Sequence, residues 1–247
     1  MIRIRGLSKR LGTRQVLDGL DLDVARGESL VVMGPSGTGK SVLLKHIIGL
    51  MKPDAGTIEV DGEEITALGE RDLDEVRKRM GMLFQGAALF DSMTVGENVG
   101  LALREHQRWP EDRIREHVRE RLQWVGLEGV ESMKPASLSG GMRKRVGLAR
   151  AIVMDPAVIL YDEPTTGLDP IRADAIDQLI RSLQRRMGST AVVVTHDMAS
   201  AFKVADRLAM LYGGRVVFQG TVEEARATRD PMMRQFIEGS SEGPIQE

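Results

Sequence analysis

Apolar and polar residues alternate in two short stretches of the first sixty positions. Leu20, Leu22 and Val24 are each separated by one polar residue, and Ile58 and Val60 repeat the pattern. Because successive side chains of a strand point to opposite sides of its sheet, this alternation predicts strands with one buried face. We therefore expect the N-terminal region to consist mainly of half-buried strands.

A continuous apolar run at residues 30–33 predicts a strand of a different kind. A strand that is covered on both faces carries apolar residues at every position rather than at alternate ones. After a glycine-rich stretch, Leu43, Leu44 and Ile47 show helical spacing within residues 42–49. The order of elements is therefore strand, loop and helix.

The segment from 86 to 154 has a helical pattern. One helix is expected between Pro110, which favours a start, and Gly126, which favours an end. Its apolar stripe consists of Ile114, Val118, Leu122 and Val125. Charged residues surround this stripe, and we interpret them as a solvated face of the helix.

Strands and helices alternate from residue 157 onward. Apolar strands are predicted at 157–161 and 191–195, and a hairpin at 208–218 around the dipeptide Gly213-Gly214. Between the two strands, a helix carries apolar residues at every fourth position: Ile171, Ala175, Leu179, Leu183 and Met187. Such alternation is typical of an α/β fold with a largely parallel core.

Charge and composition narrow the class of protein. The 247 residues include 34 Lys and Arg against 36 Asp and Glu, a net charge of −2, and there is no cysteine. A nearly neutral chain has no global attraction to nucleic acid, and without cysteine it has neither disulfides nor a thiolate zinc site. The longest apolar runs are far shorter than the ~20 residues that a membrane-spanning helix needs. With no apolar signal segment at the N-terminus, we expect a soluble chain that is not exported.

The glycine-rich stretch matches the phosphate-loop pattern G-x-x-x-x-G-K-[ST] in the strand–helix setting that this motif requires. Its residues are Gly34, Pro35, Ser36, Gly37, Thr38, Gly39, Lys40 and Ser41. Glycines let backbone N–H groups approach a phosphate closely, and the positive end of the following helix points at the same place. Lys40 is expected to reach the β- and γ-phosphates, and the Ser41 hydroxyl to bind Mg²⁺. A chance match has odds on the order of one in a hundred in a chain of this length.

Two acids follow the predicted strand at 157–161. Asp162 and Glu163 would lie at the carboxyl end of the sheet, where α/β proteins bind ligands. Asp162 suits the surroundings of Mg²⁺, and Glu163 suits positioning and deprotonating the attacking water. Taken alone, the pair fits an ordinary strand end equally well; the phosphate loop upstream favours the catalytic interpretation.

A second anion site is predicted at Ser139, Gly140 and Gly141. These residues start a helix that continues into a basic amphipathic run at 143–151. Free N–H groups and the Ser139 hydroxyl would point outward together at that helix start. Because one nucleotide needs only one such site within a subunit, the second site suggests a nucleotide held by another subunit.

With these motifs in order, the chain resembles the ATP-binding cassette (ABC) family. Gln85, after a strand at 80–84, matches the family's Q-loop, and residues 138–142 match its signature, with Met142 where Gln is usual. Asp169 ends a stretch that matches the D-loop, and His196 matches the switch histidine. The resemblance covers nearly the whole chain.

The resemblance implies a P-loop NTPase of the α/β class in a single ABC domain, residues 1–247. Segments 1–85 and 155–225 would form an antiparallel β-subdomain and a RecA-like parallel core. Segment 86–154 would form an inserted helical subdomain that carries the signature, and 226–247 a C-terminal helix and an extended tail.

The resemblance also implies the cofactors ATP and Mg²⁺ and the roles of individual residues. Two cassettes would sandwich two ATP molecules, so that Ser139, Gly140 and Gly141 of one cap the γ-phosphate held by Lys40 of the other. The residues implied for catalysis are Glu163, His196, Lys40 and Gln85. Those implied for ATP binding are residues 34–41, the signature residues and Asp169, and those for Mg²⁺ are Ser41, Gln85 and Asp162.

One departure from the family concerns adenine. ABC cassettes usually stack the base on an aromatic residue shortly before the second strand, but residues 8–14 contain none. Adenine would then pack on the Leu11 side chain or on the guanidinium of Arg10 or Arg14.

Three stretches narrow the resemblance to the ATPase of Mla/Mce-type phospholipid transporters: residues 77–95, 139–142 and 234–239. This implies an ATP-hydrolysing motor that moves phospholipid or a related lipid between bacterial membranes, located at the cytoplasmic face of the inner membrane. The implied partners are a second copy, transmembrane permease subunits, a periplasmic lipid-binding protein and a small cytosolic accessory protein, and no nucleic acid. Residues 85–99 would form a groove that binds a helix of the permease. The apolar residues of this segment would either line the groove or pack in the core of the helical subdomain: Leu89, Phe90, Met93 and Val95.

Other ABC proteins are the alternatives. A polar amino-acid importer or a cell-division cassette is disfavoured by Met142 and by the C-terminal stretch. DNA-repair or chromosome-organising ABC proteins carry a long coiled coil between the two halves of the site, and ribosome-acting ones carry two cassettes in tandem. This chain has only ordinary helices in that interval and one cassette, which disfavours both.

Overall fold

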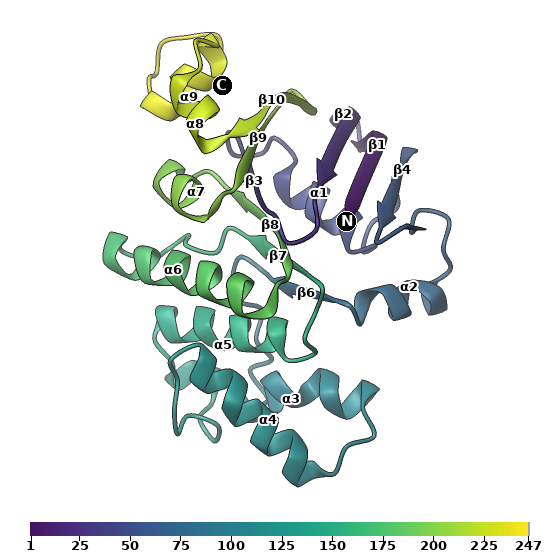
Figure 1. The fold of residues 1–247 in the computed structure, drawn as a ribbon, viewed down its shortest axis with the longest axis vertical. Coiled ribbons are helices and arrows are strands. Elements are labelled where there is room, and N and C mark those ends of the chain that lie inside the picture. The colour runs from purple at the N-terminus through teal and green to yellow at the C-terminus, as the bar shows by residue number, and fades with distance from the viewer. Residues whose placement is uncertain (247) are drawn as a thin grey trace. The chain divides into compact units, whose positions relative to one another are not determined.

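The computed structural model describes residues 1–246 as two compact units (Figure 1). The first unit joins Met1–Leu73 to the chain from Val192 onward, and the second is Asp74–Ala191. Two elements run across the boundaries: helix α2 (Glu70–Arg77) and strand β8 (Thr190–Thr195). Each unit is described in turn.

An antiparallel sheet in the first unit has the strand order β2-β1-β4-β5. Its strands are β1 (Ile2–Leu11), β2 (Arg14–Val24), β4 (Ala55–Val60) and β5 (Glu63–Glu64). The alternating residues Leu20, Leu22, Val24, Ile58 and Val60 are all buried. The prediction of half-buried strands is therefore confirmed.

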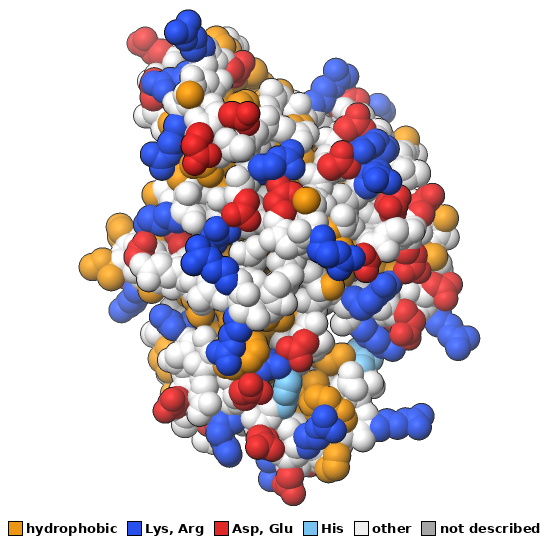
Figure 2. Space-filling view, in the orientation of Figure 1, with side chains coloured by type: hydrophobic (Ala, Val, Ile, Leu, Met, Phe, Trp, Pro, Cys, Tyr) orange, Lys and Arg blue, Asp and Glu red, His pale blue; other side chains and the backbone are white. Residues whose placement is uncertain are grey.

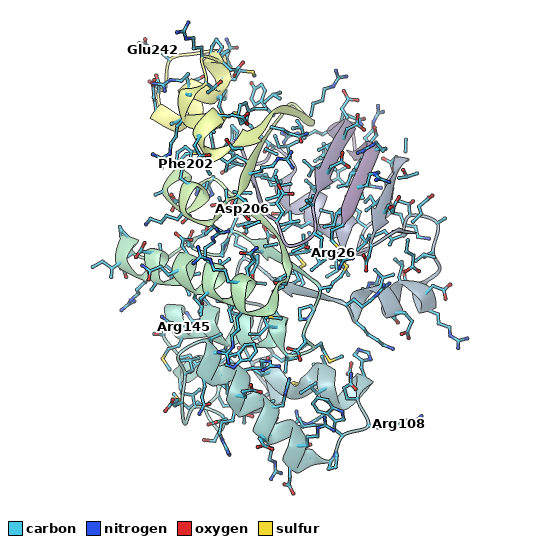
Figure 3. The ribbon with its side chains drawn as sticks, in the orientation of Figure 1. Arg26, Arg108, Arg145, Phe202, Asp206 and Glu242 are labelled. Carbon is cyan, nitrogen blue, oxygen red and sulfur yellow. The ribbon has the colours of Figure 1, made fainter. Side chains whose placement is uncertain are left out.

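The parallel part of the first unit is built on β3 (Ser29–Met33), whose five residues are all buried. It pairs in parallel with β9 (Arg207–Tyr212), which forms an antiparallel hairpin with β10 (Arg215–Thr221) around the predicted Gly-Gly turn. Asp206 ties the two parallel strands together: its N–H donates to the Ser29 carbonyl and its carboxylate accepts from the Ser29 N–H, both at 2.8 Å (Figure 3).

The helices of the first unit are α1 (Lys40–Ile47), α7 (Met198–Val204), α8 (Val222–Ala227) and α9 (Pro231–Glu238). The guanidinium of Arg226 on α8 lies 4.5 Å from the centre of the Phe202 ring on α7 (Figure 3). Beyond α9, the Gln235 side chain binds the tail by donating to the carbonyl of Ser240 and accepting from the N–H of Ile245. Residues 240–245 thus fold back on α9.

The second unit contains the parallel pair β6 (Met80–Leu83) and β7 (Val158–Asp162). Its helices after α2 are α3 (Val95–His106), α4 (Glu111–Trp124), α5 (Gly140–Ile152) and α6 (Pro170–Met187), with a 3-10 turn at Pro135–Ser137. Helices α3, α4 and α5 lie against one another (Figure 1). As predicted, Pro110 precedes α4 and the apolar stripe of that helix is buried.

The buried face of α6 does not follow the four-residue spacing of its apolar residues. Ile171 leaves 84% of its surface exposed, whereas the residues that face the core are Ala173, Ile176, Ile180 and Leu183. A helix turns once in 3.6 residues, so positions four apart drift steadily around its surface instead of staying on one side. The spacing thus predicted the helix correctly, and of the five residues that marked it Leu183 is among those that face the core.

The surface carries charges of both signs. Lys and Arg side chains are interspersed with Asp and Glu over the face drawn in Figure 2. The electric fields of neighbouring opposite charges largely cancel, and salt screens what remains beyond about 8 Å at physiological ionic strength. Among residues 1–246, no helix is long and apolar enough to cross a membrane.

A tight contact between β6 and α5 gives a test of this packing. A Cβ at Gly81 would overlap the backbone carbonyl of Ala151. Overpacking of this kind typically costs about 1–3 kcal/mol, so Gly81→Ala should lower the thermal midpoint by roughly 2–12 °C at about 2–4 °C per kcal/mol. The matched control is Gly69→Ala, where an added Cβ meets no atom within 4 Å. Equal midpoints for the two variants in thermal unfolding would contradict the observed packing.

Candidate functional site

The phosphate loop lies in the first unit, between β3 and α1. The Lys40 ammonium is folded back over this loop and donates to the carbonyl oxygens of Gly34 at 2.7 Å and Pro35 at 2.9 Å. The Thr38 hydroxyl also donates to the Pro35 carbonyl, at 2.9 Å. Lys40 is only 5% exposed. Residues 34–39 thus form a loop whose carbonyl oxygens bind the buried Lys40 ammonium, and Lys40 and Ser41 begin α1.

Two glycines let this loop pack closely on its surroundings. A Cβ at Gly34 would overlap the backbone carbonyl of Leu211 on β9. Gly39, with φ of 102°, precedes α1, and a Cβ there would come within 2.9 Å of the Val16 side chain on β2. A side chain at either position would therefore displace the loop from the strands that hold it.

The tip of the β1–β2 hairpin reaches the same loop. The Arg14 guanidinium donates to the Gly37 carbonyl at 3.1 Å. Leu11 is paired with Arg14 across the hairpin and leaves 42% of its surface exposed, and Arg10 donates to the Gln15 side chain. Leu11, Arg10 and Arg14 are the three residues expected to pack on adenine. Of these, Arg14 donates a hydrogen bond directly to the phosphate loop.

His196 follows β8 in the first unit and is exposed. Its neighbour Asp197 caps α7: one carboxylate oxygen accepts from the N–H of Ala199 at 2.8 Å. The Asp197 N–H in turn donates to the Thr195 hydroxyl at 3.0 Å. Both flanks of the histidine are held by short-range hydrogen bonds, so its backbone position is fixed by β8 and α7.

The acidic pair ends β7 in the second unit. Asp162 and Glu163 are each 7% exposed. Glu163 has φ of 48°, a left-handed conformation that non-glycine residues rarely adopt, and its carboxylate accepts from the Thr166 hydroxyl at 3.0 Å. Strained backbone of this kind persists only where the surroundings hold it, and it is concentrated at functional sites.

Gln85 is exposed just beyond the end of β6, and its backbone carbonyl accepts a hydrogen bond from the Lys144 ammonium. The same ammonium donates to the Glu163 carbonyl at 3.1 Å. Burial lowers the pKa of Lys144, while the nearby carboxylates of Asp162 and Glu163 oppose that shift. Sequence analysis missed this residue because it lies within the basic run 143–151. The signal that could have revealed it is its spacing: Lys144 lies four residues before Leu148, on the buried side of α5.

The signature residues begin α5. The Ser139 side chain caps this helix by accepting from the N–H of Met142 at 3.3 Å, and Gly140 is its first residue. Asp169 caps α6 by accepting from two N–H groups and pairs with the Arg172 guanidinium at 3.2 Å. A Cβ at Gly141 would lie 3.9 Å from the Arg172 side chain. Gly141 thus lies close to Arg172, the residue that pairs with Asp169.

The model of the family described as ABC transporter matches residues 17–166. This match spans more than half of the chain and includes the phosphate loop, the Q-loop residue, the signature and the acidic pair. The chain belongs to the ABC transporter family. The family assignment and the P-loop α/β fold class expected from the sequence are confirmed, and the chain is an ATPase.

Relatives in bacteria align with almost the entire chain. The chain is 44% identical over 99% of its length, and 70% of the relative's, to "Probable ribonucleotide transport ATP-binding protein mkl" of Mycobacterium leprae. It is 42% identical over 99% of its length, and 91% of the relative's, to "Intermembrane phospholipid transport system ATP-binding protein MlaF" of Escherichia coli K12.

Solved cassettes share the fold. A dimeric post-hydrolysis state of the cassette MJ0796 with ADP and Pi has a TM-score of 0.83 at 33% identity, covering 90% of this chain and 99% of that one. The cassette cbiO1 of Clostridium perfringens, part of the ABC transporter complex cbiONQ, has a TM-score of 0.84 at 31% identity, covering 93% of this chain and 91% of that one. ATP as the nucleotide follows from the family.

A buried histidine on α1, the helix that begins with Lys40 and Ser41, should make the free energy of unfolding depend on pH. His46 in its last turn is 1% exposed and donates from Nδ1 to the Val42 carbonyl at 2.7 Å. Burial lowers its pKa below the ordinary value of 6.5. Below that pH the unfolded chain binds a proton that the folded chain does not, so the free energy of unfolding should fall as pH falls.

The measurement is urea unfolding of the wild type and His46→Leu between about pH 5 and 8, a window centred on the ordinary histidine pKa. Replacement by leucine removes the titrating group and should flatten the acid side of the profile. An equally steep loss of stability in both proteins would show that His46 does not cause it.

Proposed function

We propose that the chain is the ATP-hydrolysing motor subunit of a transporter that moves phospholipid between bacterial membranes. The observation that carries this proposal is the 42% identity to MlaF proteins over 99% of the chain and 91–93% of those relatives. The mkl proteins, named for ribonucleotide transport, are equally similar in identity, but the match spans only 68–70% of their length. Ribonucleotide transport is therefore the second candidate.

The nucleotide site is proposed to use the residues predicted from the sequence. Residues 34–41 bind the phosphates, with Lys40 at the β- and γ-phosphates. Glu163 directs water at the γ-phosphorus and accepts its proton, and His196 contacts the γ-phosphate. The buried position of Glu163 and its hydrogen bond from Thr166 support this role, because a general base must be held in one orientation.

The donors proposed for Mg²⁺ suit a hard cation. Ser41, Gln85 and Asp162 offer a hydroxyl, an amide and a carboxylate, and all three coordinate through oxygen, as Mg²⁺ prefers. When bound, the ion neutralises charge on the β- and γ-phosphate oxygens. Asp162 is held at the end of the fully buried strand β7, so its carboxylate has little freedom of position.

Association with a second copy and with a permease is part of the proposal. Ser139, Gly140 and Gly141 would cap the γ-phosphate bound to the partner copy, with Asp169 nearby; the dimeric MJ0796 cassettes support this arrangement. The permease would place the chain at the cytoplasmic face of the inner membrane. Phe90, which is 50% exposed, suits the permease groove, whereas the fully buried Val95 is a core residue. A periplasmic lipid-binding protein and a small cytosolic accessory protein would complete the complex.

Replacing the proposed base tests the catalytic assignment. Glu163→Gln keeps the size of the side chain and removes its ability to accept a proton. ATP turnover should fall on the order of 100-fold or more, while nucleotide binding, measured with a fluorescent ATP analogue, should stay intact. The matched control is Lys40→Ala, which should weaken binding itself. Hydrolysis by Glu163→Gln at the wild-type rate would remove Glu163 from the mechanism.

Isolation of the intact membrane complex tests the transported class. Mass spectrometry of the co-purifying molecules should find phospholipid together with a membrane-spanning partner. Stimulation of ATP turnover by ribonucleotides other than ATP, and not by lipid, would favour the second candidate. Stimulation by amino acids would instead assign the chain to an importer.

A further inference from the structure

Helix α5 packs against residues 85–88, the segment that follows β6, and donates hydrogen bonds to its backbone. Three residues along one side of the helix make this contact: Lys144, Gly147 and Arg150. A Cβ at Gly147 would come within 2.7 Å of the Leu83 side chain and 3.1 Å of Ala87. The Arg150 guanidinium donates to the carbonyls of Ala87 at 2.6 Å and Ala88 at 2.7 Å.

This segment has an unusual backbone. Ala87 and Ala88 have φ of 62° and 45°, so two consecutive alanines adopt the left-handed conformation that their Cβ atoms disfavour. Such a conformation persists only when its surroundings determine it. The carbonyls bound by Lys144 and Arg150 lie at both ends of residues 85–88, and these two cations hold the segment in place.

Lys144 also reaches the next strand. Leu83 on β6 pairs with Tyr161 on β7, so Gln85 and Glu163 occupy equivalent places, two residues beyond the paired positions. The Lys144 ammonium donates to the backbone carbonyls of both. Glu163 is itself left-handed, so one ammonium holds the backbone at two points where neighbouring strands leave the sheet.

We propose that Lys144 is a positioning residue for ATP hydrolysis, which joins the backbones of Gln85 and Glu163 and thereby fixes the directions of their side chains. This inference rests on the proposed roles of Gln85 and Glu163. The Thr166 hydroxyl holds the Glu163 carboxylate from one side, and Lys144 holds the backbone from the other. A displacement of about 1 Å in such a group can lower the rate on the order of 100-fold.

The position of Lys144 on α5 has a consequence for the dimer. Ser139 lies five residues earlier, at the start of the same helix, about 7.5 Å along its axis at 1.5 Å per residue. A shift of α5 that moves Ser139 therefore also moves the ammonium bound to Gln85 and Glu163. In the proposed dimer, the helix that caps the partner's nucleotide is thus connected to the water-activating residue of its own subunit.

The test compares three variants of the full chain in steady-state ATP hydrolysis. Lys144→Met keeps an unbranched stem and removes every donor; its kcat should fall about 10- to 100-fold, with KM and the affinity for nucleotide within about twofold. Lys144→Arg restores donors and should recover most of kcat. The matched control is Arg145→Met: Arg145, labelled in Figure 3, donates to the Val125 carbonyl instead and should leave kcat unchanged.

Double substitution separates positioning from general stability. If Lys144 acts through Glu163, adding Lys144→Met to Glu163→Gln should cause no further loss of single-turnover rate, because the two changes remove the same function. Independent, multiplying losses would overturn the proposal. If Lys144→Met does not fold, Lys144→Leu, which also has no donor, is measured against the same criteria, with thermal unfolding recorded for each protein.

The remaining outcomes separate this inference from the proposed function. An unchanged kcat in Lys144→Met, or equal losses in Lys144→Met and Arg145→Met, overturns the role of Lys144 alone. Wild-type hydrolysis by Glu163→Gln overturns the proposed role of the base, on which the inference rests.

Discussion

Complete burial of four strands constrains where chemistry can occur in this protein. All residues of β3, β6, β7 and β8 are buried. A polar side chain within such a strand would lose its hydration without a partner. The proposed groups lie at or just beyond carboxyl ends: the phosphate loop after β3, Gln85 after β6, Asp162 at the last position of β7 with Glu163 after it, and His196 after β8.

Loops that leave buried strands must satisfy their backbone carbonyls, and two buried lysines do this in the same way. Lys40 donates to the carbonyls of Gly34 and Pro35, and Lys144 donates to those of Gln85 and Glu163. An ammonium group has three donors on a flexible stem, so a single lysine can join two loop segments. The cost of burying each charge is offset by these charge-assisted hydrogen bonds.

Close backbone packing sets the limits on side-chain size around both loops. Gly34 lies against β9, and Gly81 and Gly147 lie at the contact between β6 and α5. At these positions any side chain would collide with a neighbouring backbone or core residue, so helix and strand approach more closely than larger residues permit. The same close approach brings Lys144 and Arg150 within hydrogen-bond distance of the segment after β6.

Many of the helices and strands, the motifs and the family could be predicted from the sequence, because the spacing of glycines, apolar runs and acids reflects local backbone geometry. It predicted β3, the phosphate loop and α1, the stripe of α4, and the turn at Gly213-Gly214. It did not determine the buried side of α6, where Ile171 is exposed, or the core position of Val95. It also did not reveal that Lys144 joins Gln85 to Glu163. Those features depend on contacts between segments far apart in the chain, where a basic residue on a helix becomes buried only when a strand end packs against it.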